Sequence, residues 1–137
     1  MPILTKRTPK EALISAAQNL TASFSSLGPE ISCLEYTKIA LWFRLDINDS
    51  TSVRVRAVSR PEKSGATDYL LPIETASVTK VSSVGGYYEL SSDTDQNIIF
   101  KIDVDNVIPY VQFQIMSGVV GIIPGQIVEA YITKGWE

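Results

Sequence analysis

The stretch Ile39-Ala40-Leu41-Trp42-Phe43-Arg44-Leu45-Asp46-Ile47 decides the fold class of this chain of 137 residues. Every odd-numbered position in it is apolar, and the positions between them include Arg44 and Asp46. Alternation with a period of two is typical of a β-strand that buries one of its faces. We therefore predict a strand over residues 39–47 that faces a core, with Trp42 on its other face.

The next segment repeats this pattern after a turn. Residues 48–50 read Asn-Asp-Ser, which favours a turn because short polar side chains bond their own backbone. Val53, Val55 and Ala57 then alternate with Arg54 and Arg56. The sequence predicts that the strands at 39–47 and 53–58 form an antiparallel hairpin.

Further short strands are expected along the rest of the chain. Pro72 makes the first of them an edge strand or a bend, and Gly85-Gly86 separates two that could pair. The expected segments are 69–73, 78–81, 87–90, 98–104 (with Ile98, Phe100, Ile102 and Val104 on one face), 109–116 (opened by Pro109, with Val111, Phe113 and Ile115 on one face) and 128–133 (with Val128, Ala130 and Ile132 on one face). Ile and Val total 27 residues against 10 Leu, and β-branched side chains favour strands. We predict an all-β chain: an antiparallel β-sandwich or jelly roll of about eight or nine short strands.

The N-terminal part divides into an arm and the start of the domain. Residues 1–12 contain Pro2 and Pro9 and are expected to be an extended arm, which either grips a partner or frays. Residues 13–137 are expected to form a single β-sandwich domain. Leu20, Ala22 and Phe24 alternate with polar residues and predict a half-buried strand, while residues 11–17 would also tolerate a helical turn.

The amino-acid composition argues against catalysis, nucleic-acid binding and metal binding. The chain has no His, one Cys and a net charge of −3, which removes the commonest general base and gives no reason to expect nucleic-acid binding. Asp93-Thr94-Asp95-Gln96-Asn97 begins like a calcium loop but lacks its Gly and final Glu, so a solvated turn is preferred to a calcium site. Cys33 is expected to be a buried, inert thiol. We predict no enzyme activity, no cofactor and no metal.

Two surface features favour interaction instead. The loop between Gly118 and Gly125 contains the aliphatic residues Val119, Val120, Ile122 and Ile123, which either plug one end of the sandwich or meet another subunit. Trp42 lies on the outward face of its strand, where it either packs locally, anchors an interface or, like Tyr87 and Tyr88, forms a platform for a glycan. Tyr110, Tyr131 and Trp136 are further aromatic candidates. With Lys6 and Arg7 of the arm, Trp42 and the four loop aliphatics are the interface candidates.

Four segments together resemble small structural proteins from the virions of tailed bacteriophages. They are Tyr69-Leu70-Leu71-Pro72-Ile73-Glu74-Thr75, Pro109-Tyr110-Val111-Gln112-Phe113-Gln114-Ile115, Ser117-Gly118-Val119-Val120-Gly121 and Pro124-Gly125-Gln126-Ile127. The chain departs from the pattern at residues 119–120 and 122–123, where small residues are usual. The resemblance implies a virion component such as a head-decoration, cement or connector-associated subunit.

We therefore expect a virion structural protein, made in the host cytoplasm, that binds capsid or other virion subunits and also itself, as a homo-oligomer such as a trimer. It is expected to bind no nucleic acid, because the net charge is −3. It is expected to bind no membrane, because no stretch approaches the roughly 20 apolar residues of a membrane span. The alternatives are a neck or tail subunit and a carbohydrate-binding module of a host-recognition structure.

Overall fold

A computed structural model describes most of the chain. The described residues are 6–34, 36–48, 52–71, 75–76, 81–82, 87–90, 96–104, 108–117 and 124–136. Within these ranges the regular structure is entirely β, with fourteen strands, many of them only two residues long. No helix in this part of the chain is long and apolar enough to cross a membrane.

The strands form two antiparallel sheets. Sheet A has the order β1 (Lys6–Arg7), β14 (Gln126–Trp136), β6 (Lys38–Asp46), β12 (Gln96–Asp103), β9 (Thr75–Ala76), and β2 (Glu11–Ala12) and β3 (Gln18–Asn19) also pair with β14. Sheet B has the order β10 (Val81–Ser82), β11 (Tyr87–Leu90), β7 (Val53–Arg60), β13 (Tyr110–Ser117), β4 (Ser25–Ser26), with β5 (Ile31–Ser32) on β13 and β8 (Tyr69–Leu71) on β7. The expected all-β, antiparallel architecture is thus confirmed.

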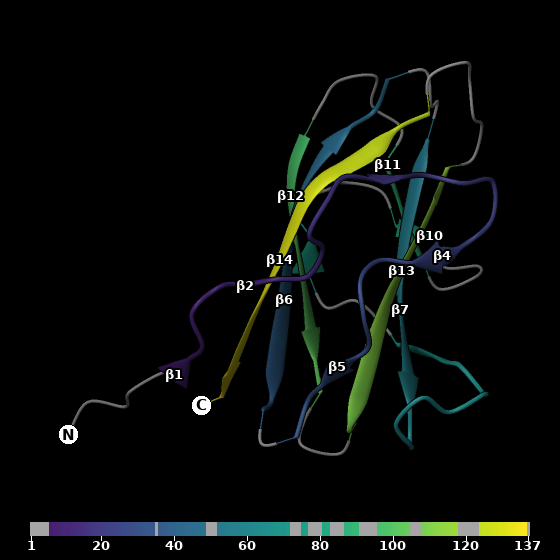
Figure 1. The fold of residues 1–137 in the computed structure, drawn as a ribbon. Coiled ribbons are helices and arrows are strands. Elements are labelled where there is room, and N and C mark those ends of the chain that lie inside the picture. The colour runs from purple at the N-terminus through teal and green to yellow at the C-terminus, as the bar shows by residue number, and fades with distance from the viewer. Residues whose placement is uncertain are drawn as a thin grey trace.

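The two sheets enclose one apolar core. In Figure 1, β14, β6 and β12 lie in one layer and β7 and β13 in the other, which gives a sandwich-like arrangement. Most of the inward positions predicted from alternation are buried, among them Leu41 and Phe43 on β6 and Phe100 on β12. The rings of Phe43 and Phe100 stack with centroids 5.5 Å apart. Burial of one face of each long strand is therefore the main stabilisation of this fold.

The predicted hairpin of residues 39–47 with 53–58 is wrong. β6 pairs with β14 and β12 in sheet A, whereas β7 pairs with β13, β11 and β8 in sheet B. The segment between them crosses from one sheet to the other. At its start, Asn48 takes the left-handed conformation with φ 49°, and its side-chain amide donates to the carbonyl of Pro124 (3.0 Å). This bond holds the corner beside the beginning of β14.

Residues 6–33 form what we call the N-terminal strap, because they run along one side of both sheets (Figure 1). The half-buried strand expected around Leu20, Ala22 and Phe24 is wrong, and so is the alternative of a helical turn at 11–17. Leu20 is buried but Ala22 is exposed, since the backbone here touches the sheets only at intervals. The backbone N–H of Leu13 donates to the carbonyl of Ala130 in β14, and that of Leu20 to the carbonyl of Gly125 just before β14. The N–H of Leu27 donates to the carbonyl of Phe113 in sheet B, and all three bonds measure 2.8 Å.

Two strands depart from simple alternation. In β14 a bulge between Ile127 and Glu129 shifts the register against β6. Ile127 is therefore buried and Val128 is not, so the prediction that Val128 shares the inward face of Ala130 is wrong. In β13 the polar residues Gln112 and Gln114 are buried. Their side chains are bonded, Gln112 donating to the carbonyl of Gly28 (2.8 Å) and Gln114 accepting from Arg56 (2.7 Å).

Candidate functional site

Trp42 is the centre of the outer face of sheet A. It lies on β6, between β14 and β12, and its side chain points away from the core, with 39% of the residue exposed. The indole Nε1–H donates to Oγ1 of Thr133 on β14 at 2.9 Å. This bond satisfies the polar end of the ring and fixes its orientation. The exposed part of the side chain is therefore apolar and held in place.

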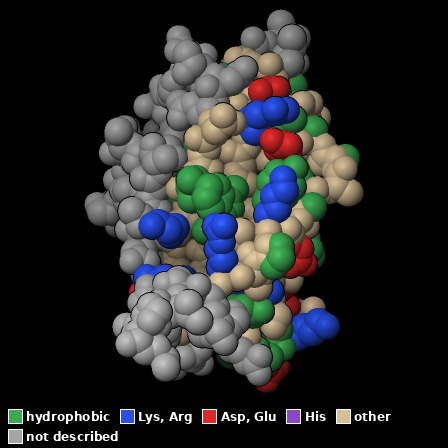
Figure 2. All heavy atoms as spheres, turned by 90° about the vertical axis from the view of Figure 1, so that its left-hand side faces the viewer, with side chains coloured by type: hydrophobic (Ala, Val, Ile, Leu, Met, Phe, Trp, Pro, Cys, Tyr) green, Lys and Arg blue, Asp and Glu red, His purple; other side chains and the backbone are tan. Residues whose placement is uncertain are grey.

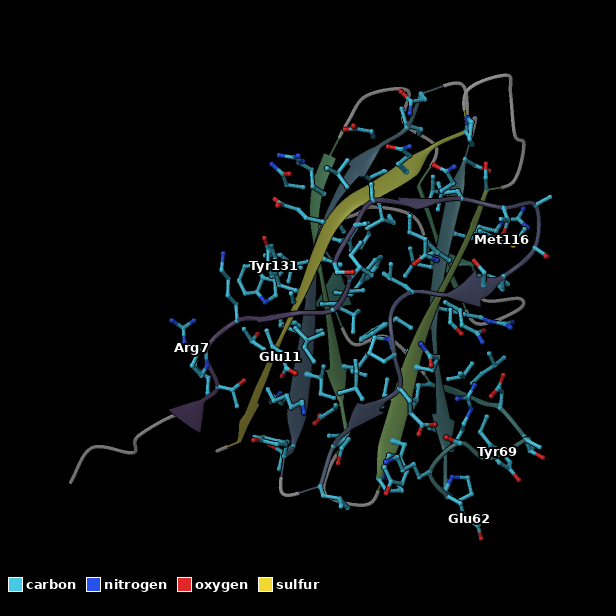
Figure 3. All side chains as sticks on the ribbon, in the orientation of Figure 1. Arg7, Glu11, Glu62, Tyr69, Met116 and Tyr131 are labelled. Atoms are coloured by element: carbon cyan, nitrogen blue, oxygen red, sulfur yellow. The ribbon has the colours of Figure 1, made fainter. Side chains whose placement is uncertain are left out.

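The register of sheet A extends this apolar surface across three strands. Tyr131 of β14 and Ile99 of β12 are the cross-strand partners of Trp42, and residues that face each other in this way share one side of the sheet. Both are partly buried. Figure 3 shows the side chain of Tyr131 pointing outward on the side of sheet A, whereas Met116 lies on the side of sheet B.

A hollow of about 350 Å³ lies between this row and the strap. We call it the arm hollow. It is lined by Arg7, Thr8, Pro9, Lys10, Trp42, Tyr131 and Thr133. The strap forms its wall because Thr8 is bonded to Lys134 twice: the Thr8 N–H donates to the carbonyl of Lys134 (2.8 Å), and the Lys134 N–H donates to the Thr8 hydroxyl (3.0 Å). The volume is within the usual range for ligand pockets.

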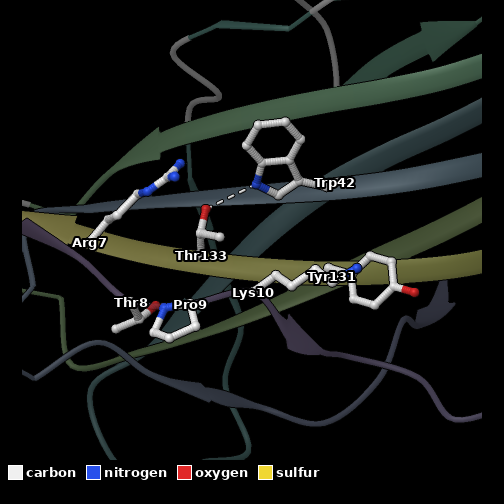
Figure 4. Close-up of a pocket in the computed structure, with 7 residues that line it drawn as sticks. All are labelled: Arg7, Thr8, Pro9, Lys10, Trp42, Tyr131 and Thr133. Atoms are coloured by element: carbon white, nitrogen blue, oxygen red, sulfur yellow. Dashed lines mark hydrogen bonds between the residues drawn. The ribbon is translucent and has the colours of Figure 1, made fainter.

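The arm hollow is cationic. No lining residue is acidic, and in the described part of the chain no ion pair joins Arg7 or Lys10 to a carboxylate. The ammonium of Lys10 lies 4.4 Å from the centroid of the Tyr131 ring, a cation–π contact. In Figure 4, Arg7 extends beside the Trp42–Thr133 hydrogen bond and Lys10 extends toward Tyr131. Two positively charged side chains thus line the same hollow as the aromatic side chains of Trp42 and Tyr131.

A second hollow, of about 290 Å³, lies farther across sheet A. We call it the sheet hollow. Its lining includes Trp42, Tyr131, Ile99, Arg44 and Glu129. Here the charges compensate each other, because Arg44 and Glu129 form an ion pair at 4.0 Å and Glu129 also accepts from the Tyr131 hydroxyl at 3.2 Å. Trp42 and Tyr131 line both hollows, so the two form one continuous surface.

Figure 2 looks onto this face of the molecule. It shows hydrophobic side chains at the middle of the described surface, with Lys and Arg side chains around them. A surface of this composition can take up an apolar group and a negative charge together. It brings together Arg7 and Trp42, which the sequence singled out for an interface, with Tyr131, one of its further aromatic candidates, and with Lys10, which it did not single out.

The other sequence candidates fall elsewhere. Lys6 pairs with Trp136 through its backbone in β1, and its side chain lies outside what the structure describes. Tyr87 and Tyr88 lie on β11 of sheet B, so their strand is not in the same sheet as Trp42. Val119, Val120, Ile122 and Ile123 lie outside the described residues, as do Asp93 and Asp95 of the calcium-like segment.

Tyr131 and Lys10 were not among the predicted interface residues, for different reasons. Tyr131 is one of several aromatics, and only the pairing of β14 with β6 places it beside Trp42. Lys10 belongs to an irregular segment, where sequence carries no periodic signal. Knowledge of the pairing between β6 and β14 would have placed Tyr131 beside Trp42. Nothing in the sequence would have indicated Lys10.

Cys33 is the only cysteine of the chain, and it is buried. Burial raises the pKa of its thiol to about 12, and the positive charge of Lys134 offsets this only in part. A thiol that stays protonated is a poor nucleophile, which fits the expected inert role. Among the described residues, no group of His, Cys, Asp and Glu side chains could hold a metal ion.

No protein-family model matches the chain, and no curated protein is similar enough in sequence to be counted as a relative.

Proposed function

We propose that this protein is a structural binding module of a tailed-phage virion, most simply a capsid decoration or cement subunit. In this proposal it attaches to its partner subunit through the outer face of sheet A. The observation that carries the binding role is the fixed, exposed Trp42 side chain between the two hollows. The virion setting rests on the sequence resemblance at residues 69–75, 109–115, 117–121 and 124–127.

The surface has the composition of a protein-binding site. Trp, Tyr and Arg are the residues enriched at the energetic centres of interfaces, and here Trp42, Tyr131 and Arg7 lie together. Because the indole is already fixed by Thr133, binding would cost little further side-chain entropy.

The proposal includes a jelly-roll arrangement of the strands. Each of the consecutive pairs β6–β7, β11–β12 and β13–β14 contributes one strand to each sheet, and crossings of this kind occur in jelly rolls. They support a jelly-roll arrangement, the form in which capsid-associated domains are commonly built.

The number of copies of this protein in each particle tests whether it is a virion component and where in the virion it lies. Mass spectrometry of purified particles should find the chain at on the order of hundreds of copies if it decorates the capsid, and about a dozen or fewer if it belongs to the neck or tail. Absence from particles would contradict the virion role.

Occupancy of particles tests the surface. Trp42→Ala should abolish incorporation, whereas Tyr69→Ala, which removes another exposed aromatic (56% exposed) on the edge strand β8, should leave it unchanged. Equal occupancy of the two variants would show that the partner binds elsewhere.

A carbohydrate-binding module is the second candidate. The observation in its favour is the arm hollow itself, where Trp42 and Tyr131 are accompanied by the hydroxyl-bearing Thr8 and Thr133. It predicts retention of a neutral glycan on an array, with loss of retention in Trp42→Ala.

A further inference from the structure

The arm hollow and the sheet hollow differ in charge. This difference indicates the charge of the group that each hollow would bind. The arm hollow presents Arg7 and Lys10, for which the described residues supply no acidic partner. The sheet hollow presents Arg44 and Glu129, which already neutralise each other. The occupant of the first should be negative, and the occupant of the second should be uncharged.

The strap gives the positive groups a defined position. Thr8, between Arg7 and Lys10 in the chain, is bonded to Lys134 through both its N–H and its hydroxyl. Arg7 is the backbone partner of Gly135 in β1, and Lys10 packs over the Tyr131 ring. The two cations are therefore carried by backbone that is paired to sheet A.

The aromatic side chains of Trp42 and Tyr131 connect the two hollows. Because Trp42 and Tyr131 line both, a bound group can extend from the cationic hollow across the Trp42 side chain toward Ile99. A single sugar ring would use only one hollow, whereas an extended peptide segment with neighbouring acidic and apolar side chains would use both. The continuity of the surface favours the peptide.

We propose that the outer face of sheet A recognises an acidic–apolar segment of a partner protein, with an Asp or Glu carboxylate between Arg7 and Lys10 and an apolar side chain on Trp42 and Ile99. The inference deepens the proposed function and rests on it only in taking the occupant to be protein. Charge complementarity assigns the carboxylate, and the neutralised sheet hollow assigns the apolar side chain.

The experiment uses the full chain and small probes. The indole and amide signals of the ¹⁵N-labelled protein are followed by NMR during titration with N-acetyl-Glu-Leu-amide, its neutral isostere N-acetyl-Gln-Leu-amide, N-acetyl-Glu-Gly-amide and glucuronate. Trp42→Phe identifies the indole signal of Trp42. We expect saturable shifts at Trp42 and Tyr131 with the first probe. We also expect affinity about tenfold weaker for the neutral isostere, because it removes the contacts with the charged groups, and weaker binding of the Gly probe.

Three charge variants sharpen the test. Arg7→Gln and Lys10→Gln should each weaken binding of the acidic probe several-fold and leave the neutral probe unchanged. Both side chains are exposed, so neither variant should unfold the protein. Lys63→Gln removes an exposed cation from the loop between β7 and β8 and should have no effect.

The contrary results are distinct. Equal affinity for the acidic and neutral probes, or no saturable shift with either, would overturn the proposal. Tighter binding of glucuronate than of the acidic dipeptide would replace it with an acidic glycan, and shifts that depend on protein concentration alone would replace it with a second copy of this chain. Absence of the chain from virions, with probe binding intact, would remove only the virion role.

Discussion

Gly28 lies directly against Leu13 within the strap. Gly28 has a φ of +70°, and a Cβ placed on it would lie 2.5 Å from both Cγ and the carbonyl oxygen of Leu13. Its own carbonyl accepts a hydrogen bond from the Gln112 side chain at 2.8 Å. Gly28 is thus enclosed by the first part of the strap and by β13, and only a residue without a side chain fits.

Gly28→Ala should therefore destabilise the protein. The left-handed backbone and the contact with Leu13 should together cost about 2–5 kcal/mol of unfolding free energy, measured by urea denaturation. Gly65→Ala is the matched control, since Gly65 has no positive φ and its nearest neighbour, the carbonyl of Glu62, lies 3.1 Å from an added Cβ; it should cost less than about 1 kcal/mol. Equal losses would show that the Gly28–Leu13 contact is not tight.

Leu27 of the strap and Leu34, the residue that follows the strap, should differ in their effect on stability because they differ in burial. Leu27 is fully buried and Leu34 is 58% exposed. Leu27→Ala leaves a cavity between the sheets and should cost about 2–5 kcal/mol, whereas Leu34→Ala should change stability by less than about 0.5 kcal/mol. If thermal denaturation gives the two variants the same midpoint, the strap does not contribute to the core.

Cys33 should make stability depend on alkaline pH. Burial raises the pKa of its thiol from 9.0 to about 12, so the folded protein binds the proton more tightly than the unfolded chain does. The stabilisation is complete below pH 9 and is lost as the pH rises toward 12. The unfolding free energy of the wild-type protein should fall more steeply over this window than that of Cys33→Ala; parallel pH profiles would contradict this.

The same thiol should report on opening of the strap. Cys33 ends the strap, and its N–H donates to the carbonyl of Pro109 at 2.8 Å. A thiol reagent should label it in urea but not in the native protein. In Gly28→Ala, labelling under native conditions should become faster, because the strap would detach more often.

Arg60 should join the strap to the loop after β7. Its guanidinium donates to Asp68 (2.8 Å) and to Glu30 of the strap (3.1 Å), and these carboxylates raise its pKa above the usual value. Arg60→Ala should cost about 1 kcal/mol, and the cost should shrink at high salt. Lys63→Ala, a nearby exposed cation, should be neutral; a loss that salt does not change would show that packing, not charge, is responsible.

Alternation predicted the long strands well. Leu41 and Phe43 on β6, Phe100 on β12 and Phe113 on β13 are all buried as expected, because burial of one face imposes a period of two on any strand in such a sheet. The position of Trp42 on the outer face follows from the same rule. This much of the candidate site could be derived from sequence.

Pairing could not be derived in the same way. The connection after Ile47 is equally short for a hairpin and for a crossing between sheets, and alternation does not say which sheet a strand joins. The bulge at Ile127 inverted the expected face of Val128. The strap has no constant backbone conformation, so its buried leucines Leu13, Leu20 and Leu27 do not share one alternating pattern. The alternation that starts at Leu20 failed at Ala22, which is exposed.

The strap also sets the order in which the molecule can be completed. Its bonding partners Phe113 and Ala130 lie on β13 and β14, far along the chain from Leu13 and Leu27. During synthesis the leucines of the strap must therefore stay exposed until these strands have been made. Contacts between such distant segments slow folding and lengthen the time available for aggregation, so this chain should depend on chaperones more than its size suggests.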